Sequence, residues 1–288
     1  MLARALLSLV NSKCEKPAEI IVVNGGGPET DEVVAKIRVQ THVPIVLIKT
    51  KNKNLATSRN VGLEYCAGEI VAMTDDDAEV FPDWVTSIRA QHAEHPEAGA
   101  VGGQVLGAES DKSILSRLAD LVTFPSPEAA GYVRTIPGVN ISYKREVVQQ
   151  IGLQDTELFR GEDVDYNWRV QQSGYKVYYD PSIKVLHHHR PSFRKLLHQH
   201  YMYGRAYYLV RKKWTNMYCV YPHGISSVRD ILKLGFFFVA IVYEPFKYAA
   251  KMSSTLLQLA AYPMLVVNQI VWRFGMVRQG ITDVIRRN

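Results

Sequence analysis

Three consecutive acids, Asp75, Asp76 and Asp77, are the first residues whose types and spacing indicate chemistry, and they follow the apolar run EIVAMT at 69–74. Adjacent carboxylates repel one another, and none is buried cheaply without a cation. Residues two apart on an extended chain point to one side, so Asp75 and Asp77 share a side and Asp76 points away. Hard divalent cations such as Mg²⁺ or Mn²⁺ bind carboxylate oxygens and keep positions open for phosphate oxygens. The triplet therefore indicates a metal site, and a solvated acidic turn is the alternative.

A second acidic pair, Glu162 and Asp163, begins the stretch EDVDYNWRVQQSGY, whose apolar residues recur at helical spacing. The N-terminus of a helix favours the ionised form of a carboxylate, which can then act as a general base. Ordinary capping of the first helical turn would place the same residues there. Both interpretations remain open from the sequence.

Two basic groups accompany these acids. Arg59 lies in KNKNLATSRN (51–60), ahead of the acidic strand and at the start of a helix-like segment. In VLHHHRP (185–191), His187 or His189 could complete a metal shell, because imidazole also binds ions such as Mn²⁺. An exposed turn would equally explain three successive histidines.

The elements that must position these residues alternate along the first part of the chain. Apolar runs at 19–23, 45–49 and 69–74 are typical of strands, and the stretches 2–10, 30–40 and 56–66 are typical of helices. This alternation predicts an α/β fold with a mostly parallel sheet flanked by helices. Ligands of such sheets bind beyond the carboxyl ends of the strands, so NGGG at 24–27 and the acidic triplet are expected to share one crevice.

The C-terminal part has a different character. Residues 184–288 carry 16 Lys and Arg against 3 Asp and Glu, whereas residues 1–183 carry 18 against 25. Aromatic and basic residues alternate at helical spacing in 192–214, and apolar stretches follow at 231–246 and 255–272. Basic flanks around apolar helices favour association with an anionic membrane surface. A membrane-spanning hairpin and a soluble helical cap are the alternatives.

Taken in order, five segments resemble the family-2 glycosyltransferases of the GT-A fold: NKNLATSRN, EIVAMTDDDAEVFPDW, GVNISYKREVVQQIG, GEDVDYNWRVQQSGY and VLHHHRPSF. The resemblance covers roughly residues 2–210. It implies a Rossmann-like GT-A catalytic domain, which we place at 1–195, and a basic, apolar helical region at 196–288. It also implies metal-dependent, inverting transfer of a sugar from a nucleotide diphosphate sugar to a hydroxyl of a lipid-linked or cell-surface glycan.

The resemblance also implies a role for each matching residue. Asp163 is expected to be the catalytic base, with Glu162 beside it, and Asp77 and His187 are expected to hold Mg²⁺ or Mn²⁺. The residues expected to bind the donor are Asn24, Arg59, Asp75, Asp76 and Arg169. The residues expected on the acceptor side are Trp168 and Asn140.

The chain departs from the family pattern near its start. The family begins with an apolar strand, whereas Met1 here leads directly into what resembles the following helix, so the first strand is expected to be missing. An acidic pair of the family is replaced by Asn24 and Gly25. Asn24 can still offer a neutral carbonyl to a base N–H, which weakens the expectation of a uracil base.

Other function classes fit less well. A nucleotidyltransferase would need a basic glycine-rich loop, and NGGGPETD has no cation. An inactive scaffold protein is a further alternative. Nucleic acid is not an expected partner, because the C-terminal cations are interleaved with apolar runs. The scattered cysteines Cys14, Cys66 and Cys219 suit a reducing compartment, and we expect a peripheral or monotopic protein at the cytoplasmic face of a membrane.

Overall fold

A computed structural model of the chain describes residues 1–51, 53–110, 113–188, 192–217, 227–252 and 254–285. The chain divides into two compact units. The first unit consists of Met1–Ala108 and Phe124–His189, and the second consists of Glu109–Thr123 and Arg190–Asn288. Helix α5 (Ile114–Thr123) lies within the range predicted for the catalytic domain, but it packs with the C-terminal helices.

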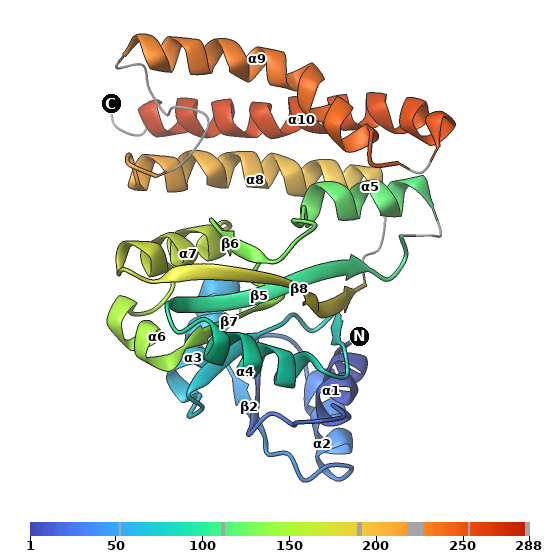
Figure 1. The fold of residues 1–288 in the computed structure, drawn as a ribbon, viewed down its shortest axis with the longest axis vertical. Helices are drawn as coiled ribbons and strands as arrows, with labels where there is room; N and C mark the ends of the chain where they lie inside the picture. The colour runs from blue at the N-terminus through green and yellow to red at the C-terminus, as the bar shows by residue number, and fades with distance from the viewer. Residues whose placement is uncertain (52, 111–112, 189–191, 218–226, 253, 286–288) are drawn as a thin grey trace. The chain divides into compact units, whose positions relative to one another are not determined.

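The first unit contains two sheets. Strands β1 (Ile20–Asn24) and β2 (Ile45–Lys49) pair in parallel. The larger sheet has the order β3-β7-β5-β8-β4, and β6 also pairs with β8 (Figure 1). Its strands are β3 (Ile70–Met73), β4 (Ala78–Val80), β5 (Ala98–Gly107), β6 (Gly131–Val133), β7 (Ile141–Lys144) and β8 (Lys176–His187).

The α/β fold class is confirmed, and the larger sheet is mixed. Within it only β5 and β8 pair in parallel among the described strands, and the other pairings are antiparallel. The alternating pattern was clear only up to β3. Beyond β3, the strands β4, β6 and β7 have four residues or fewer, which is too short to show a reliable period in the sequence.

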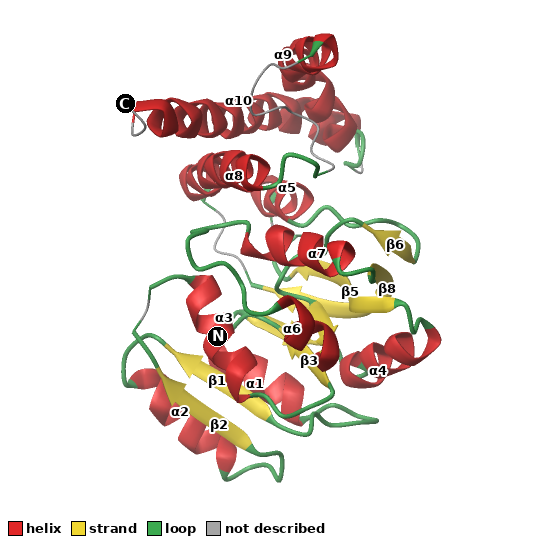
Figure 2. Cartoon of the chain, turned by 90° about the vertical axis from the view of Figure 1, so that its left-hand side faces the viewer, coloured by secondary structure: helices red, strands yellow, loops and turns green. Residues whose placement is uncertain are grey.

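Helices cover both faces of the larger sheet (Figure 2). One apolar cluster joins β5 and β8 to α4 (Trp84–Glu94) and also includes residues of α1 (Leu2–Val10) and α2 (Glu29–Arg38). The other cluster joins β5, β7 and β8 to α6 (Arg145–Ile151) and α7 (Glu162–Gln172). Successive residues of a strand point to opposite faces, so Ala100 belongs to one cluster and Val101 to the other.

Helix α3 (Leu55–Tyr65) links the smaller sheet to the acidic turn. It begins at Asn54, whose side chain accepts a hydrogen bond from the Thr57 N–H at 2.9 Å. This is ordinary N-capping. The Asn54 amide also donates to the Thr156 carbonyl at 2.8 Å, which ties the start of α3 to the segment before α7.

The second unit is helical and consists of α5 (Ile114–Thr123), α8 (Phe193–Lys213), α9 (Val228–Ala249) and α10 (Thr255–Ile285). Helices α8 and α10 approach closely at two glycines. A Cβ on Gly204 would lie 1.8 Å from the Trp272 carbonyl oxygen, and a Cβ on Gly275 would lie 2.1 Å from that of Tyr201. A larger residue at either position would separate the two helices.

This helical unit buries polar side chains beside its apolar clusters and exposes many apolar side chains. Its buried polar side chains among the described residues are Ser116, His200, Arg211, Asn268, Arg273 and Gln279. Large apolar side chains on α9 and α10 are exposed, among them Leu232, Phe238, Val239, Phe246, Leu259 and Phe274. By length and composition α10 is a candidate membrane span, and 17% of its most apolar window is buried.

Candidate active site

The acidic triplet forms a tight turn between β3 and β4. The Ala78 N–H donates to the Asp75 carbonyl at 3.1 Å, and the His188 N–H donates to the Asp77 carbonyl at 2.9 Å. This turn, rather than an extended strand, brings the Asp75 and Asp77 side chains together and leaves Asp76 exposed. Desolvation, followed by the negative charges of Asp77 and Asp75, raises the pKa of Asp76. Part of this shift comes from the neighbouring carboxylates, whose mutual repulsion a cation would relieve.

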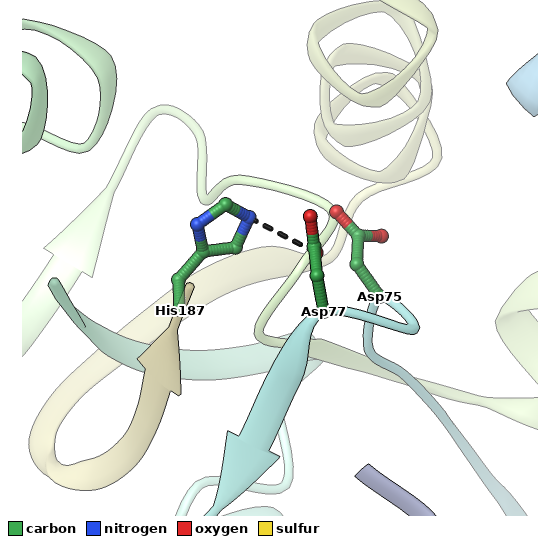
Figure 3. Close-up of side chains that lie close together, drawn as sticks. All are labelled: Asp75, Asp77 and His187. Atoms are coloured by element: carbon green, nitrogen blue, oxygen red, sulfur yellow. Dashed lines mark ion pairs between the residues drawn. The ribbon is translucent and has the colours of Figure 1, made fainter. Parts of the chain in front are cut away.

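His187 faces this turn from the end of β8, next to Ala78 on β4 (Figure 3). Its Nε2 lies 3.2 Å from Asp77 Oδ1, and the edge of its ring meets the Phe124 ring at 5.1 Å between centroids. One potential ligand atom from each of Asp75, Asp77 and His187 lies within 4.8 Å of the others.

Two carboxylates and one imidazole at this spacing fit a divalent ion. Carboxylates alone would suit Mg²⁺, and the imidazole favours an ion such as Mn²⁺. Asp77 and His187, the two residues predicted as metal ligands, lie close together, and Asp75 lies beside them. The alternative ligand His189 lies outside the described residues.

Arg59 connects the turn to α7. Its guanidinium donates to Asp75 Oδ1 at 3.2 Å and to Glu162 Oε1 at 3.0 Å, and only 10% of the side chain is exposed. Gly138 makes room for it, because a Cβ on Gly138 would lie 2.3 Å from Arg59 Nη1. Gly138 was not among the predicted site residues, although the Pro-Gly dipeptide at 137–138 is a turn signal in the sequence.

The two acids at the start of α7 differ in accessibility. Gly161 caps the helix in a left-handed conformation with φ 79°, which favours glycine. The Glu162 side chain is 5% exposed, and burial, followed by the charge of Asp163, raises the pKa of Glu162 although Arg59 opposes this effect. Asp163 is partly exposed and accepts from the Gly138 N–H at 3.1 Å and the Val164 N–H at 2.8 Å. Asp163 is therefore the more accessible of the two carboxylates.

Asn140, which was predicted on the acceptor side, is held inside the fold. It is fully buried, accepts a hydrogen bond from Trp84 Nε1 at 2.8 Å, and donates to the carbonyls of Ile183 and Gln104 at 2.9 and 3.0 Å. These bonds join β5, β8 and α4, so Asn140 supports the fold. Trp168 is also buried, with 8% of its surface exposed.

Arg169 is likewise occupied within the fold. Its guanidinium pairs with Asp165 at 3.1 Å and donates to the carbonyls of Ile151 and Leu153, both at 2.6 Å. These contacts tie α7 to the end of α6 and the residues after it. Arg169 therefore positions the helix that carries Asp163, and each of its three nitrogens donates a hydrogen bond within the fold.

Asn24 shapes the glycine loop after β1. Its Oδ1 accepts from the Gly26 N–H at 2.7 Å, and its Nδ2 donates to the Gly27 carbonyl and to Asp31 Oδ1, both at 3.1 Å. Asp31 also pairs with Lys49 at 2.5 Å. These residues line a cavity of about 240 Å³ at the ends of β1 and β2. The side-chain amide of Asn24, which was predicted to contact a nucleotide base, makes these hydrogen bonds within the loop instead.

The mixed α/β fold and an acidic turn that fits a divalent ion are features of a GT-A-type glycosyltransferase. Residues 1–152, more than half of the chain, match the family described as Glycosyl transferase family 2. The chain belongs to this family, which favours the predicted glycosyltransferase class over the nucleotidyltransferase alternative.

Two curated relatives resemble the chain in sequence, and one solved structure resembles it in fold. A glucosyl-dolichyl phosphate glucuronosyltransferase of Haloferax volcanii is 27% identical over 60% of this chain and 59% of its own length. A poly-beta-1,6-N-acetyl-D-glucosamine synthase of Staphylococcus aureus is 28% identical over 61% of this chain and 44% of its own length. The chain thus spans less than two thirds of these relatives. A mannosyltransferase from Pyrobaculum calidifontis, solved with GDP-Man and Mn²⁺, has 17% identity and a TM-score of 0.64, with 96% of this chain and 83% of that chain covered.

Proposed function

We propose that this glycosyltransferase moves a sugar, with inversion, from a nucleotide diphosphate sugar to a hydroxyl of a lipid-linked or cell-surface glycan. We further propose that Mg²⁺ or Mn²⁺ bound by Asp75, Asp77 and His187 is required. The observation that carries the proposal is the convergence of these three side chains within 4.8 Å of one another. The Mn²⁺ in the solved mannosyltransferase agrees with this choice of ions.

A divalent ion bound here would supply positive charge that stabilises the departing nucleotide diphosphate. Arg59 neutralises part of the Asp75 charge and fixes the turn relative to α7. Arg59 thus holds Asp75, beside the proposed metal, and Glu162, beside the proposed base, in fixed positions.

Asp163 is the base in this proposal. It is partly exposed, and the backbone N–H groups of Gly138 and Val164 orient its carboxylate. From this position it accepts the proton of the attacking hydroxyl, while Glu162 stays buried against Arg59. Inversion follows if the hydroxyl attacks on the side of the sugar opposite the departing diphosphate.

The names of the relatives support the acceptor class. One relative is named for a dolichyl phosphate substrate and the other for a polysaccharide product. Both names are consistent with an acceptor hydroxyl on a lipid-linked sugar or on a growing glycan. We propose the same class of acceptor here.

The direct test is turnover of nucleotide sugars by the full chain. Release of nucleotide diphosphate from a panel of sugar donors is measured with Mn²⁺, with Mg²⁺ and with excess EDTA. We expect at least one donor to be consumed with metal and none with EDTA. Turnover that is unaffected by EDTA would contradict the metal assignment, and failure of every donor in the presence of metal would contradict the proposed donor class.

We also propose that the second unit associates with the cytoplasmic face of an anionic membrane as a peripheral or monotopic element. Three observations support this proposal: the exposed apolar side chains of α9 and α10, the buried polar groups inside the unit, and the exposed cations Arg229, Lys247 and Lys251. Apolar insertion combined with attraction to anionic lipid headgroups is the usual basis of such binding.

Liposome sedimentation tests the membrane proposal. We expect the protein to sediment with phosphatidylserine-containing vesicles at low salt and less so as salt rises. Phe238→Asp and Phe274→Asp, at side chains 63% and 61% exposed, should weaken the binding. Val39→Asp in the first unit, at a side chain 87% exposed, is the control and should leave it unchanged. A protein that stays in the supernatant at low salt would contradict the proposal.

A further inference from the structure

The cavity at the ends of β1 and β2 has a distinctive set of walls. Gly26, Gly27 and Pro28 line it without a polar side chain, and Asp31 and Lys49 contribute its charges. Glycines let a flat ring lie close to the backbone. A cavity of about 240 Å³ with one apolar wall and one charged edge suits a planar, hydrogen-bonding group.

The charged edge is held in a fixed arrangement. One oxygen of Asp31 accepts from Asn24 Nδ2 at 3.1 Å, and the other pairs with Lys49 Nζ at 2.5 Å. The Asp31 side chain is 29% exposed and that of Lys49 is 71% exposed, so both remain reachable by a ligand. Each carboxylate oxygen has a second lone pair, and the ammonium has two further N–H groups. The edge therefore presents a donor next to two acceptors.

One donor next to two acceptors is the hydrogen-bonding pattern complementary to the edge of guanine. Guanine offers the O6 acceptor beside the N1–H and N2–H donors, whereas uracil and thymine place a single N–H between two carbonyls. Adenine and cytosine each offer only one exocyclic amino group beside a ring-nitrogen acceptor. We propose that Asp31 and Lys49 select a guanosine diphosphate sugar as the donor, with Asp31 accepting from N1–H and N2–H and Lys49 donating to O6. This inference rests on the proposed function, because it places the base of the sugar donor in this cavity.

The fold connects the cavity to the acidic turn through one helix. A Cβ on Gly62 of α3 would lie 3.7 Å from Val23, the residue before Asn24. Arg59, one turn earlier on the same helix, pairs with Asp75. Helix α3 thus contacts both β1, which ends at the cavity, and the acidic turn, so a donor with its base in the cavity would extend along α3 toward Asp75, Asp77 and His187.

Binding of GDP, inosine diphosphate and UDP to the full chain, measured calorimetrically with Mn²⁺, tests the inference. Inosine diphosphate keeps O6 and N1–H but lacks the 2-amino group that Asp31 is proposed to bind. We expect GDP to bind about 5- to 150-fold more tightly than inosine diphosphate, the range for one well-placed polar contact to a base. UDP should bind more weakly than GDP.

Two variants separate the roles of the charged residues. Asp31→Asn should bring the affinities for GDP and inosine diphosphate together, because its amide cannot accept at both positions. Lys49→Met should weaken both ligands alike, because both carry O6. Glu32→Gln removes an exposed charge from the next residue of α2 and is the control, which should keep the wild-type preference. Thermal unfolding of each variant verifies that it is folded.

The affinities of the wild-type protein are sufficient to contradict the inference, even if the variants do not fold. Equal affinity for GDP and inosine diphosphate, or tighter binding of UDP, would contradict guanine recognition and leave the glycosyltransferase proposal standing. Failure of all three diphosphates to bind with Mn²⁺ would instead contradict the proposed donor class.

Discussion

Arg59→Met removes the positive charge that joins the two acidic parts of the site and keeps most of the apolar stem. The guanidinium lies 3.0 Å from Glu162, whose side chain is 5% exposed, and 3.2 Å from Asp75, whose side chain is 30% exposed. Breaking a buried ion pair by removing one partner costs about 3–5 kcal/mol, whereas an exposed pair contributes about 0–1 kcal/mol. Most of the lost stability should come from the pair with Glu162, because that carboxylate is the buried one. Glu162 can take up a proton once Arg59 is gone, so we expect the free energy of unfolding to fall by about 3 kcal/mol near neutral pH, the lower end of the range.

The loss should depend on pH in a defined direction. Burial and the charge of Asp163 already raise the pKa of Glu162, and removal of Arg59 raises it further. A carboxyl whose pKa is higher in the folded than in the unfolded state stabilises the fold at low pH, and this contribution is lost as pH rises through the folded-state pKa. The destabilisation by Arg59→Met should therefore shrink between pH 7.5 and pH 5.

Urea unfolding, followed through tryptophan fluorescence, is the assay, since Trp84 and Trp168 are buried in the same unit as Arg59. Arg59→Met combined with Glu162→Gln should be more stable than the sum of the single losses predicts. The control is Lys53→Met, whose partner Glu157 lies 3.9 Å away in an exposed pair, and it should cost about 0–1 kcal/mol. A coupling energy below about 0.5 kcal/mol, or a loss that grows on acidification, would refute the reasoning.

Three further predictions concern the site and the core beneath it. Asp163→Asn should lower turnover roughly 10²- to 10⁴-fold in a single-turnover assay with donor affinity nearly unchanged, and the base would be reassigned if Glu162→Gln had the larger effect. Gly138→Ala should displace the Arg59 guanidinium, so both turnover and the unfolding midpoint should fall; an unchanged midpoint would show that the loop adapts. His92 is buried, and this burial, followed by the charge of Lys144, lowers its pKa to about 4. The neutral form is thus favoured in the folded state, and stability should fall by about 2 kcal/mol from pH 7 to pH 5, a fall that His92→Gln should reduce in urea titrations at both pH values.

Local pattern was sufficient to predict the first elements of the fold. Helix α1, strands β1 and β2 and helix α3 lie within one residue of the predicted ranges, because each carries a clear period in its own sequence. Asp77 and His187 were predicted as metal ligands and Asp75 as a donor-binding residue, and the structure brings all three together. The prediction came from the order of motifs in a known family, since no local period brings residue 187 to residue 77.

Long-range contacts explain what the sequence did not reveal. Asn140 stands in a motif segment and resembles a site residue, yet its partners Trp84 and Ile183 are far away in the chain and bury it. Helix α10 continues through Pro263, which ordinarily breaks a helix, and neighbouring Ala261 and Leu265 are buried against residues of α5. The packing of 109–123 with the C-terminal helices is likewise tertiary, and no composition shift marks it.

The most direct test of the account is Mn²⁺-dependent binding of GDP to three proteins: the wild type, Asp77→Ala and the neighbouring variant Asp76→Ala. Asp77 faces His187 at 3.2 Å, whereas Asp76 is exposed and lies outside the group of potential ligands, so each variant removes one carboxylate from the same turn. We expect calorimetry to show metal-dependent binding for the wild type and Asp76→Ala and to show none for Asp77→Ala. Binding by Asp77→Ala that equals the wild type would contradict the metal site on which the account depends.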